Sequence, residues 1–205
     1  MATTKSLYGV HPSVTMVQNW RATLKEKTGR SLDEWIALIR KSAPKGEKER
    51  RDWLREKHGF GTFSAITLLD HVETGTADFA SAESYLAAAD RYVGAMFAGP
   101  KAALRPLYDA LLDIGLATGP GVKACPCRTI VPLYRKHVFA QIKPSTRTRI
   151  DMGFALGALP AEGRLIDTGG HAKKDRITHC IPISSLADID REVRKWMKTA
   201  YDLDK

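Results

Sequence analysis

The segment VKACPCRTIVPLYRKHVFAQIKPSTRTRIDMGFAL, residues 122–156, decides the fold of this chain. It predicts three consecutive β-strands in a chain that is otherwise mostly helical. In the third of these strands Ile150, Met152 and Phe154 alternate with Arg149 and Asp151, and this period of two is typical of a strand with one buried face. The segment therefore predicts a sheet that packs one face against a core.

The same segment is unusually basic. Residues 122–150 contain no Asp or Glu, whereas their Lys and Arg residues are Lys123, Arg128, Arg135, Lys136, Lys143, Arg147 and Arg149. Positive charge that no carboxylate opposes attracts anions. Arg135, Lys136 and Arg147 fall in the predicted hairpin turns, so the positive surface would form a rim around the sheet.

The rest of the sheet follows from the sequence after this segment. Residues 176–183 predict a fourth strand with the same alternation. Pro132, in the first strand, and Pro182, in the fourth, have no N–H for a ladder, which predicts that both lie on edge strands. The antiparallel order first, second, third, fourth satisfies both constraints. A helix around residues 104–112 and a last helix capped by Ser185 would cover one face of this sheet.

The first part of the chain predicts a helical module. Apolar residues recur at helical spacing over residues 12–27 and 47–57, and Ser31 and Glu34 form a capping box for a helix between them. Small and polar residues 73–82 indicate a linker. The expected fold class is α+β: an all-helical module over residues 1–73, then an α+β module over residues 81–205 whose four-stranded antiparallel sheet has helices on one face.

One turn of the helical module has two interpretations. Gly59-Phe60-Gly61, followed by Ala65 and Leu68, resembles the hairpin of helix-hairpin-helix modules, whose glycine turn presents backbone N–H groups to a DNA phosphate. That resemblance implies an anion site at Gly59 and Gly61, although the basic residue usual after the second glycine is replaced by Thr62. The structural alternative is that Gly59 ends one helix and Thr62 caps the next.

Composition excludes several classes of protein. The net charge is +9, with 14 Lys and Arg against 12 Asp and Glu in residues 1–99 and 18 against 11 in residues 100–205. No apolar run reaches the roughly 20 residues of a transmembrane helix, and the N-terminus lacks a signal-peptide pattern, so a cytoplasmic location is expected. Three cysteines favour reduced thiols over a disulfide scaffold or a zinc site. The sequence predicts no metal site and no cofactor.

Two segments resemble protein families. TGRSLDEWIALIRKS, residues 28–42, and REKHGFG, residues 55–61, resemble the N-terminal helical module of a bacterial family without an assigned function, over roughly residues 11–72. Residues 104–201, which end in SSLADIDREVRKWMKTAY, resemble a second uncharacterised family and, more distantly, frataxin-like iron-chaperone domains. Frataxins hold iron at an acidic ridge. Because this module is basic, we expect no iron.

One loop suggests chemistry outside the sheet. In residues 167–175 Gly169 and Gly170 would let backbone N–H groups approach an anion, and Lys173 and Lys174 would add charge. His171 could act as a general base, but no nucleophile with an orienting acid can be assigned to it. A solvated turn is the alternative. Since no catalytic motif occurs, an enzyme is disfavoured.

The second face of the predicted sheet carries the functional hypothesis. This face has Arg149, Asp151, Arg176 and Thr178, and is solvated, covered by the first module, or a docking platform for an anionic partner. Few aromatic residues accompany it, which favours contact with phosphates over base stacking. The sequence thus predicts a non-enzymatic binding protein for nucleic acid or another polyanion. The alternative is an enzyme or small-ligand protein with a pocket between the modules near Gly169-Gly170-His171, and a homodimer is a further expectation. The expected anion-binding residues are Arg128, Lys143, Arg147, Arg149, Lys173, Lys174, Arg176, Gly59 and Gly61.

Overall fold

A computed structural model describes residues 6–74 and 78–205 of the chain. These residues form two compact units: the helical unit, His11–Ala87, and the sheet unit, which consists of Ala88–Lys205 and the N-terminal segment up to Val10. Helix α5 (Ala82–Met96) crosses the boundary between the units. Part of the expected linker, residues 75–77, lies outside the described residues.

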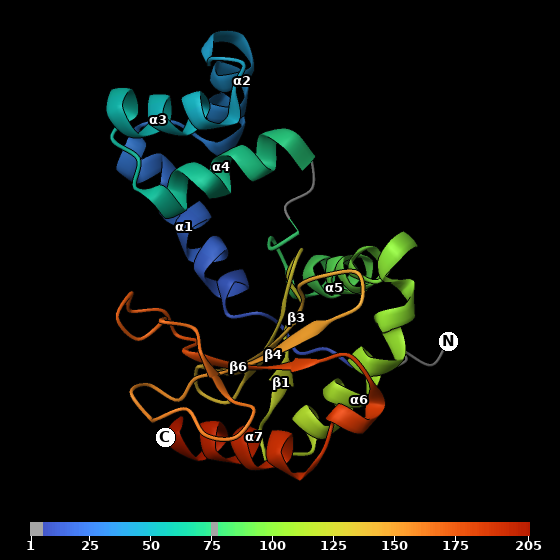
Figure 1. Ribbon diagram of the computed structural model, residues 1–205. Helices are drawn as coiled ribbons and strands as arrows, with labels where there is room; N and C mark the ends of the chain where they lie inside the picture. Colours follow the sequence, from blue (N-terminus) through green and yellow to red (C-terminus); the bar gives the residue numbers. More distant parts are fainter. Residues whose placement is uncertain (1–5, 75–77) are drawn as a thin grey trace. The chain divides into compact units, whose positions relative to one another are not determined.

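The helical unit contains α1 (Ser13–Thr28), α2 (Leu32–Ser42), α3 (Glu47–His58) and α4 (Thr62–Thr74) (Figure 1). The predicted capping box is present, because the Ser31 hydroxyl accepts from the N–H of Glu34 and the Glu34 carboxylate accepts from the N–H of Ser31. Gly59 ends α3 with a φ of +71°, a conformation that glycine adopts without strain. Since α4 begins at Thr62 itself, the residue before it is Gly61, which has no side chain to cap the helix.

Aromatic side chains form the core of the helical unit. Trp35 is 2% exposed and packs edge-on against Phe60, with ring centroids 4.8 Å apart. Its indole N–H donates to the hydroxyl of Thr28 over 2.8 Å, so the one polar atom of this buried ring is satisfied. Leu54 and Leu68 bring α3 and α4 into the same cluster.

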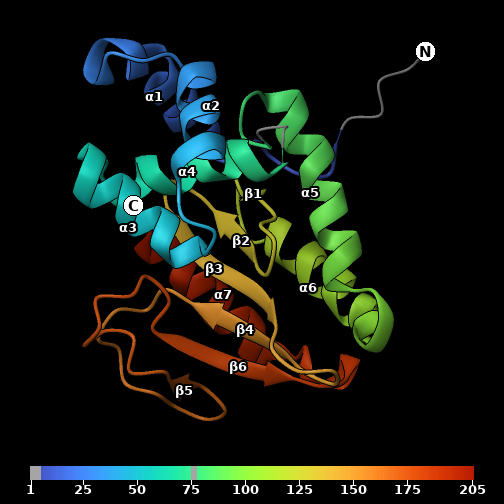
Figure 2. The ribbon, with the colours of Figure 1, turned by 90° about the horizontal axis from the view of Figure 1, so that it is seen from above.

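The sheet unit is built on one antiparallel sheet of six strands (Figure 2). Its order is β1-β2-β3-β4-β6-β5. The strands are β1 (Lys123–Ala124), β2 (Val131–Tyr134), β3 (Val138–Pro144), β4 (Ile150–Phe154), β5 (Ile166–Asp167) and β6 (His179–Ile183). The overall α+β class is confirmed, but the prediction of four strands is wrong, because the two-residue strands β1 and β5 extend the sheet at either side.

The two prolines show why four strands were predicted. Pro132 lies in β2, and its carbonyl accepts from the N–H of Cys125, just beyond the end of β1. The missing N–H of Pro132 therefore points to a residue beyond the end of β1, so the β1–β2 ladder loses no hydrogen bond. Pro182 pairs with Asp151 of β4, whereas β5 pairs with β6 only as far as Cys180. Both prolines thus lie where the outer ladder has ended.

Helices α6 (Arg105–Leu116) and α7 (Arg191–Leu203) lie on the same side of the sheet (Figure 1). The 3₁₀-helix η1 (Gly99–Leu104) precedes α6, and a second one, η2 (Leu186–Asp188), precedes α7. Ser185 lies before η2 instead of capping the last helix as predicted. That cap is Asp190, whose carboxylate accepts from the N–H groups of Glu192 and Val193.

The apolar face of the sheet follows the predicted alternation. Ile142, Met152 and Ile181 are opposite one another on adjacent strands and are fully buried. A register shift between Leu133 and Tyr134 leaves Phe139 as an extra residue of β3, and its ring lies 5.6 Å from that of Tyr201 on α7. The bulge therefore adds Phe139 to the core.

The opposite face differs from its prediction in two residues. Asp151 lies on it as expected, and Gln141 and Lys143 of β3 lie on the same face, since Lys143 pairs with Asp151 in the ladder. Arg176 and Thr178, however, precede β6. Thr178 is 2% exposed, and its hydroxyl accepts from the N–H of Leu156. In the described residues no helix is long and apolar enough to cross a membrane.

Candidate functional site

The sheet unit has a cavity of about 570 Å³ beside the end of β3, which we call the basic cavity. Four cationic side chains line it, and no Asp or Glu does. Three of the four, Arg128, Lys143 and Arg147, belong to the residues predicted from the sequence. The lining residues are Ala95, Met96, Ala98, Pro100, Lys101, Arg128, Thr129, Lys143, Pro144, Ser145 and Arg147.

Two short turns position the predicted cations. The N–H of Cys127 donates to the carbonyl of Ile130, which closes a turn that presents Arg128. Between β3 and β4 the N–H of Thr146 donates to the carbonyl of Arg149, and this turn presents Arg147. Both arginines are exposed. Hydrogen-bonded turns hold such side chains in place at a smaller entropic cost than free loops.

The carboxylate of Asp151, which lies opposite Lys143 in the ladder, is already paired. Asp151 lies 2.9 Å from the Nε of Arg149 in an ion pair, and it accepts hydrogen bonds from the Nη2 of Arg149 over 3.5 Å and from the hydroxyl of Ser145. Arg149 is therefore less available to a ligand than the sequence suggested. Lys143 and Arg147 have no ion pair among the described residues, so their charge is not neutralised within the sheet unit.

The fourth cation, Lys101, was not predicted. It lies in η1, and its ammonium donates to the carbonyl of Pro144 over 2.6 Å. This contact brings η1 beside the end of β3, where Met96 and Pro144 supply buried apolar surface. Lys101 is 42 positions before Lys143, so no sequence pattern links the two residues. The one signal near Lys101 is the Gly99-Pro100 break, which begins a new helical segment.

The glycine loop after β5 lies apart from these residues in the structure of the sheet unit. The N–H of Gly169 donates to the carboxylate of Asp167, and that of Gly170 donates to the hydroxyl of Thr168. A Cβ at Gly170 would lie 2.5 Å from the carbonyl oxygen of Ile177, so close packing requires this glycine. The backbone N–H groups proposed for an anion are thus bonded within the loop. His171, Lys173 and Lys174 are exposed and do not line the basic cavity.

Arg176 has a different partner from the one expected. Its guanidinium donates to the carbonyl of Val138 over 2.7 Å and to the carboxylate of Asp204 over 2.7 Å. Asp204 also accepts from the backbone N–H groups of Lys136 and His137. Arg176 therefore ties the chain after α7 to the β2–β3 turn.

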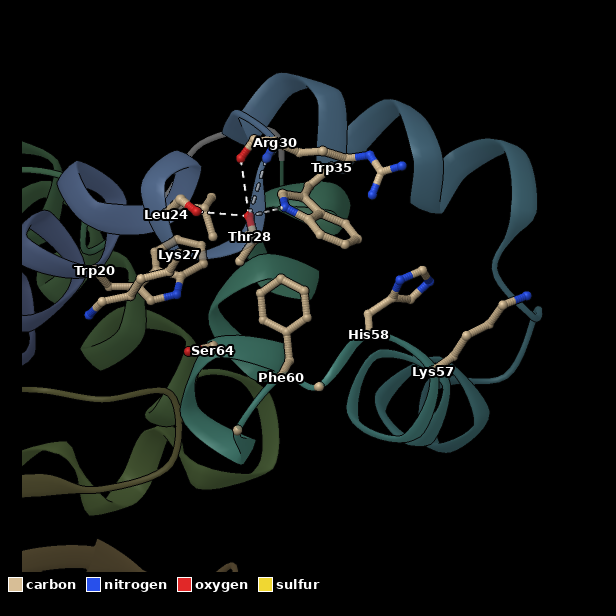
Figure 3. Close-up of a pocket in the computed structure, with 12 residues that line it drawn as sticks. Trp20, Leu24, Lys27, Thr28, Arg30, Trp35, Lys57, His58, Phe60 and Ser64 are labelled. Atoms are coloured by element: carbon tan, nitrogen blue, oxygen red, sulfur yellow. Dashed lines mark hydrogen bonds between the residues drawn. The ribbon is translucent and has the colours of Figure 1, made fainter.

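Gly59 and Gly61 belong to a second cavity, of about 530 Å³, in the helical unit (Figure 3). We call it the hairpin pocket. The ends of α1 and α3 and the starts of α2 and α4 surround it. Its lining residues are Trp20, Leu24, Lys27, Thr28, Arg30, Trp35, Lys57, His58, Gly59, Phe60, Gly61 and Ser64.

The described residues contain neither a reactive thiol nor a cluster of metal ligands. All three cysteines are free, and burial raises the pKa of Cys125 to about 12 and that of Cys127 to about 11. Such thiols are poor nucleophiles near neutral pH. No group of three His, Cys, Asp or Glu side chains that could hold a metal ion occurs among the described residues.

Two family patterns match the chain. The domain of unknown function DUF5655 matches residues 93–204, and the domain of unknown function DUF4287 matches residues 17–74. The resemblance to two uncharacterised modules is thereby confirmed. Neither a curated protein nor a solved structure is similar enough to match.

Proposed function

We propose, for a chain that belongs to the family of the domain of unknown function DUF5655, that it binds nucleic acid or another polyanion at the basic cavity of its sheet unit. The observation that carries this proposal is the convergence of Lys101, Arg128, Lys143 and Arg147 around one cavity without a lining carboxylate. Several cations at one place act together, because each contact with a phosphate releases condensed counterions from the polyanion.

The chemistry of the lining favours the backbone of the polyanion over its bases. No aromatic residue lines the basic cavity, and Phe139 of β3 is fully buried. Base recognition on a sheet relies on exposed rings. The proposed contacts are therefore charge-assisted hydrogen bonds to phosphate oxygens at the rim, with sugar carbons against Met96 and Pro144 on the floor.

Iron binding is not part of this proposal. A frataxin-like role would need carboxylate oxygens, because hard cations prefer them. The basic cavity presents four cations instead. An enzyme or small-ligand site at the loop of Gly169, Gly170 and His171 is the alternative proposal, and it is weakened by the internal bonds of both glycine N–H groups.

The test is a binding titration of labelled single-stranded and duplex DNA and RNA across a range of salt concentrations. We expect binding at low salt that weakens as salt rises. In the Lys143→Gln/Arg147→Gln double variant the slope of log K against log salt should fall in magnitude by about 1.5, since each lost phosphate contact contributes about 0.7–0.9.

A matched control separates the cavity from general positive charge. The Lys173→Gln/Lys174→Gln double variant loses the same charge from an exposed loop, and we expect it to bind nearly as well as the unaltered protein. An absence of binding at low salt contradicts the proposed function. An equal loss in both double variants contradicts the location.

Light scattering at the same concentrations would register the expected homodimer.

A further inference from the structure

The hairpin pocket is a concavity bounded by the ends of α1 and α3 and the starts of α2 and α4. Gly59 and Gly61 line it together with Trp20 and Lys27 of α1 and Arg30, which lies between α1 and α2. Figure 3 shows Trp20, Lys27 and Arg30 around Phe60. A cavity of about 530 Å³ falls within the roughly 300–1,000 Å³ of sites for small ligands.

The rim of the pocket is positive. Lys27, Arg30 and Lys57 are exposed and line it, and no Asp or Glu does. None of the three has an ion pair among the residues that the structure describes. The pocket therefore offers three cations to a ligand with negative charge.

The floor adds aromatic surface and an unsatisfied polar atom. Phe60 lies between Trp20, Trp35 and His58 (Figure 3), and the ring of His58 is 5.1 Å from that of Trp35. The Nε2 of His58 is buried and has no hydrogen-bond partner among the described residues. Buried polar atoms are nearly always paired, so an unpaired one in the lining of a cavity indicates a missing partner.

The first turn of α4 supplies backbone donors. The N–H groups at the start of a helix have no partner within the helix, and a side chain before the helix usually accepts from one of them. Here that residue is Gly61, which lines the pocket. A Cβ at Gly61 would meet nothing within 4 Å, so steric crowding does not require a glycine there.

We propose that the hairpin pocket binds a nucleotide, with the phosphate between the cationic rim and the first turn of α4 and the base against the partly exposed ring of Trp20. The nucleotide is either free or an unstacked unit of a single strand, because both present the same ring and phosphate. This site lies in the helical unit, and it does not depend on the basic cavity of the sheet unit.

The experiment titrates the full-length protein with adenosine 5′-monophosphate, adenosine, inorganic phosphate and a short single-stranded oligonucleotide. Tryptophan fluorescence follows binding, because Trp20 and Trp35 line the pocket. We expect the monophosphate or the oligonucleotide to bind at least tenfold more tightly than adenosine or phosphate alone. Binding of the monophosphate assigns a free nucleotide, and binding of the oligonucleotide alone assigns a strand.

Two substitutions of one glycine give the decisive comparison. In the Gly61→Asp variant the new carboxylate would accept from the first turn of α4 and occupy the place of the phosphate, so we expect at least tenfold weaker binding. The same variant should be as stable as the unaltered protein or more so, since Asp is a favoured cap. The Gly61→Ala variant adds only a methyl group and should retain binding.

Separate outcomes address the two proposals. The Lys143→Gln/Arg147→Gln variant of the basic cavity should keep its affinity for adenosine monophosphate, and a loss there would overturn the assignment to the hairpin pocket. Binding that is unchanged in the Gly61→Asp variant, or no binding by any of the four probes, would overturn it as well. Unchanged binding in the Gly61→Asp variant leaves the salt-dependent binding at the basic cavity untouched, whereas an oligonucleotide that fails to bind at low salt contradicts the proposed function as well.

Discussion

Asp204 is a buried carboxylate with four donors around it. Its side chain is 1% exposed, and it accepts from the N–H groups of Lys136 and His137, from the His137 ring and from Arg176. Burial alone would raise the pKa of Asp204, but the hydrogen bonds from His137 and Lys136 and the charge of Arg176 hold that pKa below its ordinary value. The ionised carboxylate therefore stabilises the folded state.

The first prediction concerns the Asp204→Asn variant. Asn has the same shape but no charge, and its side-chain NH₂ group would face the N–H donors that bind the carboxylate of Asp204. Because hydrogen bonds to a charged group contribute about 1.5–3 kcal/mol, we expect the free energy of unfolding of the sheet unit to fall by about that amount. Hydrogen exchange of β2 and β3 in urea would measure it.

An exposed acid in the last turn of α7, two residues before Asp204, provides the control. Asp202 pairs with Lys198 one turn earlier, and its side chain is 54% exposed. An exposed pair of this kind contributes about 0.3–0.5 kcal/mol, so Asp202→Asn should leave the exchange rates nearly unchanged. Equal effects of the two substitutions would contradict the role given to Asp204.

Single residues were the hardest feature to predict from the sequence. Lys143 and Arg147 could be selected because they lie in a segment without acids, and they do line one cavity. Arg176 was selected because it falls on the second face of the predicted sheet, but it pairs with Asp204, 28 positions later. No periodicity links residues so far apart, and a count of charges cannot tell a paired cation from an unpaired one.

At the scale of elements, α7 approaches the segment after α6 closely. A Cβ at Gly119 would lie 2.4 Å from the ring carbon Cζ of Tyr201, whose hydroxyl donates to the carbonyl of Pro120. The same ring packs against Phe139 of β3. Tyr201 is therefore held on several sides and cannot move away from a larger residue at position 119.

The second prediction compares two glycine substitutions. Gly119→Ala should destabilise the sheet unit by about 1–3 kcal/mol, the usual cost of overpacking. Gly94→Ala lies inside α5, is exposed and would meet nothing within 4 Å, so it should stabilise that helix by about 0.5–1 kcal/mol. Thermal denaturation of both variants measures these shifts. A rise in melting temperature for Gly119→Ala would contradict the close contact with Tyr201.

Long and regular elements could be predicted from the sequence, whereas short or irregular ones could not. The alternation of Ile150, Met152 and Phe154 gave β4 and its buried face, and the capping box of Ser31 gave the start of α2. Strands β1 and β5 have two residues each, too few for a period of two to be visible. The bulge at Phe139 depends on the register with β2, which only the folded sheet defines.

At the scale of the whole molecule, the uneven charge was predictable but the two cavities were not. The excess of positive charge in residues 100–205 is a property of composition. The basic cavity, however, needs the end of α5, η1 and two turns to meet, and the hairpin pocket needs four helix ends. Cavities arise from tertiary packing, so sequence patterns indicated their charges and not their walls.

The two units also differ in the groups that titrate. In the helical unit burial lowers the pKa of His11 and of His58 below the ordinary 6.5, and Lys57 and Arg30 add to the effect at His58. The Nδ1 of neutral His11 accepts from the N–H of Ser13 at the start of α1, over 3.0 Å. A protonated ring could not accept there, and its charge would oppose the helix dipole.

The last prediction follows from these shifts. Because the folded pKa of each histidine is lowered, the unfolded chain binds protons more readily, and the helical unit should lose stability as the pH falls below about 6.5. The lowered pKa of Asp204 matters in a lower pH range. Its contribution to the stability of the sheet unit is present above about pH 3.8 and is lost only as the pH falls further. Between about pH 6.5 and 4.5, acid should therefore weaken the helical unit and spare the sheet unit.

Thermal unfolding at several pH values tests this separation. Tryptophan fluorescence reports mainly on the helical unit, since Trp20, Trp35 and Trp53 lie there and only Trp196 lies in the sheet unit. The His11→Asn variant keeps an acceptor for the N–H of Ser13 but does not titrate near neutral pH, so its midpoint should depend less on pH. A fluorescence midpoint that is the same at about pH 7.5 and about pH 5.5 would mean that burial does not hold these histidines neutral in the folded state.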